Sequence, residues 1–294
     1  MRPKQRKGIF ITAATVFGIF AAGLLFSALR IRREEGIALS KGMSPVYWAD
    51  RFTGKDYFDP ARRIWFKGNR DRKTVCLTID DGPHPVSCQR MIEVLKEKNV
   101  KAAFFLVGKQ VDGNPDLVRM MVEGGHEICN HTYDHVRLDK LSRQKVFDQI
   151  HGCDVAVENA IGKKMTLFRP PGTRYSDTVL DVLKQKNEVL VYYTMGAKDF
   201  VGTVPDYELT PELRKLPKIT SKLIQEYVLK QLKPGSIILL HDNPITAEAL
   251  GPMIDEIRAK GYEFETCAEM MKHLPNPVYV DVNPAASNIV AQSR

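Results

Sequence analysis

Two adjacent carboxylates, Asp80 and Asp81, lie in the segment TIDDGPH at residues 78–84. The apolar residues 75–79 predict a buried strand, and a helical pattern starts near Pro85, so the pair occupies a turn at the carboxyl end of a strand. Folds of the α/β class hold their catalytic groups at this position. Successive side chains of a strand point to opposite faces, which lets the two carboxylates serve different purposes. Paired acids are tolerated beside a bound cation, although Asp-Gly-Pro is also common in turns that carry no chemistry.

Two histidines, His131 and His135, are four residues apart in the segment HTYDH. If this segment forms a helical turn, both imidazoles lie on one face, about 5–6 Å apart at Cβ. Two imidazoles and one carboxylate form a three-ligand set that leaves a position open for water, as catalytic zinc requires. Zn²⁺ suits these ligands first, and another divalent first-row ion such as Co²⁺ is the alternative. A surface turn with two unrelated histidines is the competing interpretation.

Further polar residues follow other predicted strands. Arg169 precedes two prolines, which favours a stiff guanidinium that keeps a neighbouring aspartate ionised and oriented. Gly172 leaves its backbone N–H open to an oxyanion. His241 ends a strongly apolar strand, where it is either a capped core residue or a general acid. Asp199 is placed to hydrogen-bond this histidine and raise its pKa.

Strand and helix patterns alternate from residue 72 to about residue 274, which indicates seven βα units. Short, continuously apolar strands favour a parallel sheet covered by helices, and seven units favour a closed or nearly closed barrel. Five of the strands end in ionisable residues, which such a barrel gathers at one mouth. An inserted loop is expected at 201–219. The predicted strands are 75–79, 102–107, 127–130, 166–169, 189–194, 236–240 and 262–264, and the predicted helices are 86–98, 115–123, 142–161, 176–185, 221–232, 245–260 and 267–273.

Several classes of function are disfavoured by what the sequence lacks. It has no Gly-x-Gly-x-x-Gly after the first strand, no phosphate loop and no Gly-x-Ser-x-Gly elbow, so we expect neither a nucleotide cofactor nor a serine hydrolase. The net charge of +8 comes largely from residues 1–35, and no basic stripe with interleaved aromatics indicates nucleic acid. The five cysteines show no CxxC spacing, and we expect Cys76 and Cys129 to be small core residues.

The N-terminus predicts a membrane anchor. Four basic residues in 1–7 precede the uncharged run 8–29, which as a helix spans roughly 33 Å and is long enough for the hydrocarbon core. The run is long for a cleavable signal peptide, and no good cleavage site precedes Arg30, so we expect an uncleaved signal anchor. The basic N-terminus favours a single-pass, N-in topology with the globular part outside the cytoplasm. Residues 30–71 are predicted to form a juxtamembrane linker and an N-terminal packing segment, and residues 275–294 a flexible tail.

Together, these motifs resemble the polysaccharide deacetylase family, whose shared part is the NodB homology domain (carbohydrate esterase family 4). The resemblance covers residues 72–274 and implies an α/β fold, a distorted (β/α)7 barrel. Any single motif is a weak signal, whereas five in the family order are specific. The matching segments are TIDDG (78–82), HTYDH (131–135), RPPG (169–172), KDF (198–200) and LLH (239–241).

The resemblance also implies separate roles for the two carboxylates. By position in the motifs, Asp80 is the general base, and Asp81, His131 and His135 bind zinc. Arg169 orients Asp80. An isoleucine replaces the usual phenylalanine of the first motif, which is a tolerable apolar exchange.

The remaining motif residues are implied to handle the substrate. His241 is the general acid and Asp199 tunes it, while the Gly172 N–H and the metal share the oxyanion. Phe200 and Leu239 are expected to line the sugar site. Phe200 replaces the usual tryptophan, so an indole N–H and some wall area near His241 are lost.

The activity implied by the resemblance is metal-dependent removal of N-acetyl groups from sugars. With an anchor that places the domain outside the cytoplasm, a cell-envelope polysaccharide is the expected substrate, and N-acetylglucosamine of peptidoglycan is the first choice. Alternatives are a chitin oligosaccharide, an extracellular poly-N-acetylglucosamine and a small non-sugar amide. A non-catalytic glycan-binding member is a further alternative, against which the intact set of motif residues argues.

Overall fold

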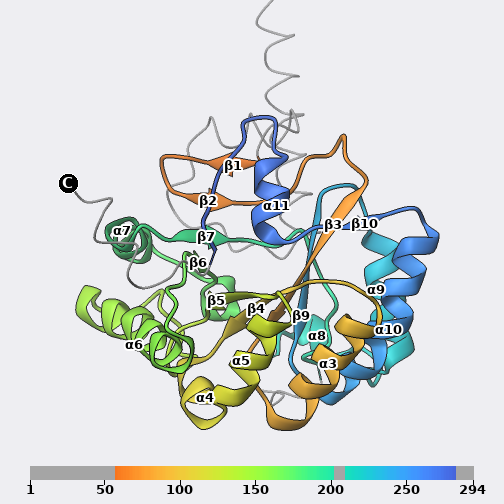
Figure 1. Cartoon of the computed structure of the whole chain (residues 1–294), viewed down its shortest axis with the longest axis horizontal. Coiled ribbons are helices and arrows are strands. Elements are labelled where there is room, and N and C mark those ends of the chain that lie inside the picture. Colours follow the sequence, from red (N-terminus) through yellow and green to blue (C-terminus); the bar gives the residue numbers. More distant parts are fainter. Residues whose placement is uncertain (1–56, 202–208, 283–294) are drawn as a thin grey trace, which may run out of the picture. The chain divides into compact units, whose positions relative to one another are not determined.

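The computed structural model describes residues 57–201 and 209–282 (Figure 1). All of the described residues belong to one compact unit. Among the described residues, no helix is both long and apolar enough to cross a membrane. The predicted anchor at 8–29 lies outside them.

A mostly parallel sheet forms the centre of the domain. Its strands follow the order β1-β2-β7-β6-β5-β4-β3-β9-β8, with β10 paired to the start of β3, and only β1 and β2 run antiparallel. Within the described ranges, β1 and β8 have no strand on their outer edges, so the sheet is an α/β half-barrel. This confirms the predicted parallel α/β architecture. The strands are β1 (Phe58–Asp59), β2 (Ile64–Trp65), β3 (Thr74–Asp80), β4 (Ala103–Leu106), β5 (Glu127–Asn130), β6 (Leu167–Phe168), β7 (Val189–Val191), β8 (Met195–Gly196), β9 (Ser236–His241) and β10 (Glu263–Phe264).

Helices cover the sheet, with α3, α10 and α9 packed side by side and α4, α5, α6 and α7 forming a second group (Figure 1). The short helix α4, the two-residue strand β8 and the one-turn helix α8 were not predicted, because elements this short show no hydrophobic period. Helix α8 lies within the expected loop 201–219. The helices are α3 (Pro85–Glu97), α4 (Gly108–Gly113), α5 (Pro115–Glu123), α6 (Arg143–Ile161), α7 (Asp177–Lys186), α8 (Pro211–Arg214), α9 (Ser221–Gln231), α10 (Pro244–Ala259) and α11 (Cys267–Lys272), with a 3₁₀ turn, η1 (Pro171–Thr173).

Both ends of the packed domain extend beyond the predicted boundaries. Strand β2 pairs in parallel with β7, and Trp65 is fully buried, so the N-terminal packing segment supplies part of the sheet. At the other end, Val278 donates its backbone N–H to Met271 O, and Thr166 donates its hydroxyl to Asp281 O. Residues 275–282, expected to be flexible tail, therefore pack against the domain.

Strand β3 lies at the middle of the sheet and positions the carboxylate pair. All seven of its residues are buried. Val75, Leu77 and Ile79 belong to one apolar cluster and Cys76 to another, as the alternation of a strand demands. Asp80 is four residues after Cys76 and therefore lies on the same face of β3. Its carboxylate points to the inner side of the curved sheet rather than to α3 and α10.

Candidate active site

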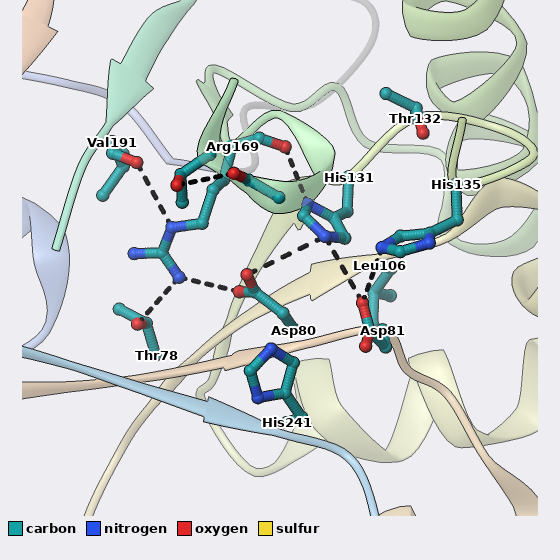
Figure 2. Close-up of polar contacts among 12 residues, drawn as sticks. Thr78, Asp80, Asp81, Leu106, His131, Thr132, His135, Arg169, Val191 and His241 are labelled. Atoms are coloured by element: carbon teal, nitrogen blue, oxygen red, sulfur yellow. Dashed lines mark hydrogen bonds and ion pairs between the residues drawn. The ribbon is translucent and has the colours of Figure 1, made fainter. Parts of the chain in front are cut away.

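Asp80 is a buried carboxylate held by an ion pair. Arg169 Nη1 donates to Asp80 Oδ1 at 2.7 Å, and both side chains are almost fully buried (Figure 2). The second oxygen, Asp80 Oδ2, lies 3.8 Å from His131 Nε2. The guanidinium and the carboxylate compensate each other's charge, and removal of either would leave the other as an uncompensated buried charge. One oxygen of Asp80 is therefore fixed, and the other faces the histidines.

Arg169 is fully buried and clamps three strands together. Its Nε donates to Val191 O at 3.2 Å and its Nη2 to Tyr192 O at 3.2 Å, at the end of β7. Its Nη1 also donates to Thr78 Oγ1 on β3 at 2.9 Å. The guanidinium stacks over the Phe105 ring, 4.2 Å from its centroid. These contacts fix the plane of the guanidinium, which in turn fixes the carboxylate that it binds.

Asp81, His131 and His135 converge on one point. Asp81 Oδ1 lies 3.4 Å from His131 Nε2 and 3.1 Å from His135 Nε2, and the potential ligand atoms are all within 4.8 Å of one another (Figure 2). Asp81 Oδ1 is buried and has no hydrogen-bond partner within the described part of the chain. A buried oxygen without a donor is costly unless a cation completes it. The three side chains therefore form a group that could hold a metal ion.

The imidazole of His131 is oriented for metal binding. Its Nδ1 lies 2.7 Å from Arg169 O. A carbonyl can only accept, so Nδ1 donates to it, and Nε2 is the ring nitrogen that faces Asp81. Metal-binding histidines in general are held through their other nitrogen in this way. Arg169 thus fixes Asp80 through its side chain and His131 through its backbone.

The loop that carries His135 is not the helical turn that the spacing suggested. No helix covers residues 131–135; instead Asp81, Thr132 and His135 have φ values of 75°, 71° and 57°. A left-handed conformation in a non-glycine residue costs about 1–3 kcal/mol and persists where surrounding contacts impose it. Here Gly108 donates its backbone N–H to Thr132 O. The predicted convergence of the two imidazoles is correct, but a strained loop produces it.

The site favours a cation electrostatically. Burial opposes ionisation of Asp81, but its contacts with His131 and His135 outweigh burial and lower its pKa well below the usual value. Burial likewise opposes the charge on His135, and contact with Asp81 reverses the effect and raises its pKa. The Asp81 carboxylate thus attracts positive charge, which a divalent ion supplies more effectively than protonated imidazoles.

His241 and Asp199 form a second polar pair beside the carboxylates. His241 Nδ1 lies 2.8 Å from Asp199 Oδ1, and Asp199 is fully buried. Burial lowers the pKa of His241, but the charge and hydrogen bond of Asp199, together with the charges of Asp81 and Asp80, overcome this and raise it to about 9. The register of the sheet places His241 on β9 directly opposite Asp80 on β3. Figure 2 shows the His241 ring facing the Asp80–Asp81 pair.

Of the predicted substrate residues Phe200, Leu239 and Gly172, Phe200 contacts the His241–Asp199 pair directly. The Phe200 ring packs edge-on against the His241 ring, with centroids 5.3 Å apart. Leu239 is almost buried yet belongs to neither apolar cluster. Gly172 is exposed, has a φ of 61° and faces open space where a side chain would stand. The structure gives no contact between Gly172 and the carboxylates, so its role stays a prediction.

Two residues of the site were not predicted. Thr78 accepts a hydrogen bond from Arg169, and Thr246 donates one to Asp199 Oδ2 at 2.7 Å. Thr78 is two residues before Asp80 and lies on the same face of β3, so strand alternation could have predicted its place beside Asp80. Thr246 lies in the first turn of α10 and gave no such signal.

A cleft of about 510 Å³ lies elsewhere, between α3 and α10. Its two basic residues are paired: Arg90 Nη1 lies 3.5 Å from Glu97 Oε1, and Lys98 Nζ lies 2.5 Å from Asp255 Oδ2. No histidine or buried carboxylate lines it. The chemistry therefore belongs to the strand ends rather than to this cleft.

The sequence matches known proteins over the region that carries the site. The profile of the family described as polysaccharide deacetylase matches residues 67–189. A peptidoglycan-N-acetylglucosamine deacetylase of Bacillus cereus is 29% identical over 73% of this chain and 96% of its own length. The peptidoglycan-N-acetylmuramic acid deacetylase PdaA of Bacillus subtilis is 30% identical over 70% of this chain and 74% of its own length. The chain spans only 60% of another relative, the uncharacterized protein YlxY of Bacillus subtilis.

Solved structures show the same fold. The peptidoglycan N-acetylglucosamine deacetylase Bc1960 aligns with a TM-score of 0.65 and 26% identity, over 78% of this chain and 97% of its own. BA3943 of Bacillus anthracis, a CE4 family pseudoenzyme, aligns with a TM-score of 0.63 and 26% identity, over 78% of this chain and 73% of its own. A mutant of BA3943 has restored enzymatic activity. The motifs, the fold and these relatives agree, and the chain belongs to the polysaccharide deacetylase family.

Proposed function

We propose that this protein is a metal-dependent hydrolase that removes N-acetyl groups from a cell-envelope polysaccharide, with N-acetylglucosamine of peptidoglycan as the first substrate. The observation that carries the proposal is the convergence of Asp81, His131 and His135 beside a carboxylate, Asp80, that a buried arginine holds ionised. Relatives named peptidoglycan deacetylases support the choice of substrate. The half-barrel is then the distorted (β/α)7 barrel that the motifs imply.

A divalent ion, Zn²⁺ or alternatively Co²⁺, held by Asp81, His131 and His135 would polarise the amide carbonyl and make a bound water more acidic. The remaining chemistry belongs to the chain. Asp80, oriented by Arg169, accepts the proton of the attacking water through its free oxygen, Oδ2.

Gly172 and His241 are proposed to act on the oxyanion and on the leaving group. The Gly172 N–H donates to the developing oxyanion. His241 carries a proton at neutral pH, because Asp199 raises its pKa to about 9, and it gives this proton to the leaving amine. Water is consumed, the C–N bond breaks, and acetate and a free amino sugar result. Phe200 and Leu239 supply apolar wall beside the acid.

Acetate release from metal-loaded protein tests the proposal and selects the substrate. Intact peptidoglycan sacculi, chitin oligomers and poly-N-acetylglucosamine are compared at equal content of N-acetyl groups. Turnover of sacculi above the others supports the peptidoglycan assignment, and turnover of chitin oligomers alone transfers it to the alternative. No release from any N-acetylated sugar would overturn the enzymatic proposal.

A non-catalytic role is the second candidate, because BA3943, a pseudoenzyme, is a structural neighbour. A protein of this kind would bind glycan without releasing acetate. In this chain the base, the three potential metal ligands and the acid pair are all present, which favours catalysis. Metal binding combined with the acetate assay separates the two candidates.

We also propose that residues 8–29 anchor the protein as a single-pass, N-in membrane protein with the domain outside the cytoplasm. The uncharged run and the basic residues that precede it support this topology. Such a location brings the site to the cell wall, which is consistent with the proposed substrate.

A further inference from the structure

Asp199 is a buried carboxylate whose side-chain hydrogen bonds, among the described residues, come from His241 and Thr246. It is fully buried, so water does not serve it. Its Oδ1 faces His241 Nδ1 at 2.8 Å. Its Oδ2 accepts the His241 backbone N–H at 2.7 Å and the Thr246 hydroxyl at 2.7 Å. Both donors to Oδ2 therefore act on the carboxylate that binds the imidazole.

Thr246 is itself fixed in place. It is fully buried in the first turn of α10, and its backbone N–H donates to the side chain of Asn243, the residue that caps this helix, at 2.9 Å. Asn243 Nδ2 also donates to Asp199 O at 3.4 Å. The start of α10 thus holds both the side chain and the backbone of Asp199. An ionised carboxylate offers no proton, so the Thr246 hydroxyl must be the donor.

We propose that Thr246 is a positioning residue for the acid step: its hydroxyl prevents the Asp199 carboxylate from turning and thereby holds the His241 ring toward Asp80. The inference rests on the proposed function, in which His241 protonates the leaving amine. Thr246 touches neither substrate nor metal in this account, and it acts only through Asp199 and His241.

Loss of the hydroxyl has a specific expected consequence. In a buried site no water replaces the missing donor, so Oδ2 keeps only the backbone N–H of His241 and the carboxylate gains freedom to rotate. The Nδ1–H···Oδ1 bond then loosens and the His241 ring samples other orientations. Proton transfer to the leaving group slows, whereas binding of substrate and metal is unaffected because Asp81, His131 and His135 lie on other loops.

The test compares Thr246→Val, which keeps the shape and removes the hydroxyl, with Thr246→Ser, which keeps the hydroxyl. In metal-loaded protein we expect Thr246→Val to lower kcat roughly tenfold, a change of about 1.4 kcal/mol in the barrier, with KM and metal content unchanged. Thr246→Ser should keep kcat within about twofold of wild type. Wild-type kcat in Thr246→Val, or an equal loss in both variants, would overturn the proposal.

Nitrogen and proton NMR of His241 provides a readout that is independent of turnover. The hydrogen-bonded Nδ1–H signal should be retained in wild type and Thr246→Ser and exchange faster with water in Thr246→Val. If Thr246→Val does not fold, Thr246→Ala takes its place; if neither folds while Thr246→Ser does, the hydroxyl is needed for folding and the proposal fails. Should wild type release no acetate, the proposed function fails, but the Nδ1–H comparison still decides whether Thr246 positions His241.

Discussion

Asp80 and Asp81 show how neighbouring residues of one type acquire opposite tasks. Asp80 ends a buried strand and is almost completely enclosed, with one oxygen bound by Arg169. Asp81 follows with a φ of 75°, and its carboxylate turns toward two imidazoles instead. The change of backbone direction between them separates the proposed base from a potential metal ligand.

The pH dependence of turnover belongs to this residue scale. His241 must be protonated to act as the acid, and its pKa is raised to about 9, so kcat should fall as the pH rises through about 9. Asp199→Asn removes the largest of the effects that oppose burial and raise the pKa of His241, so the decline should move to lower pH. A kcat–pH profile of both proteins, with metal content verified at each pH, checks the shift. An identical basic limb in the two proteins would show that His241 is not the acid.

At the scale of elements, Arg169 joins the end of β6 to β7 and to β3. All of its named contacts are inside the half-barrel, where one positive charge balances one carboxylate. Without Arg169, Asp80 would remain as an uncompensated buried charge, and the ends of three strands would lose a common partner. The Arg169 side chain thus both holds the ends of the strands together and orients Asp80, the proposed base.

Arg169→Met should lower the free energy of unfolding by about 3–5 kcal/mol, because it leaves the buried Asp80 carboxylate without its partner charge. Urea denaturation measures the loss. Arg137→Met is the matched control, since Arg137 is exposed and pairs with Asp139 at the surface, where such a pair contributes about 0–1 kcal/mol. The double variant Arg169→Met/Asp80→Asn should regain part of the loss. Equal losses of stability in Arg169→Met and Arg137→Met would contradict the claim that the buried Arg169–Asp80 pair stabilises the fold.

Much of the element scale follows from the sequence. Periodicity predicts α5 (Pro115–Glu123) and β5 (Glu127–Asn130) with their observed bounds, and alternation along β3 predicts that Asp80 and Asp81 diverge. The conformation of residues 131–135 does not follow, because tertiary hydrogen bonds impose left-handed backbone on non-glycine residues. The spacing of His131 and His135 is compatible with a helix, yet the backbone of Gly108 and Gln149 holds the loop open instead.

At the scale of the whole molecule, the sheet and the site come from distant parts of the chain. Strand β2 joins the sheet before the first motif, and residues 275–282 pack after the last one. The residues of the site come from the ends of five strands and the loops that follow them, so they converge only when the half-barrel is assembled. Fold and site therefore form together, and isolated motifs would have no activity.

The proposed anchor predicts where the full chain is found. In cells it should sediment with membranes and resist extraction with carbonate, whereas a variant lacking residues 8–29 should be released, because the uncharged run supplies the apolar length needed to span the bilayer. Alkaline phosphatase fused to the C-terminus should be active, since this reporter folds outside the cytoplasm. Activity only of a reporter that requires the cytoplasm would reverse the topology and remove the support for a cell-wall substrate.

The central claim is that Asp80 acts as the base beside a metal held by its neighbour. Acetate release from peptidoglycan sacculi per mole of bound metal, measured for wild type and Asp80→Asn, tests it most directly. We predict that Asp80→Asn binds as much metal as wild type, because Asp81, His131 and His135 are intact, and loses about 10²–10⁴-fold in turnover. Turnover by Asp80→Asn close to that of wild type, at equal metal content, would contradict the account.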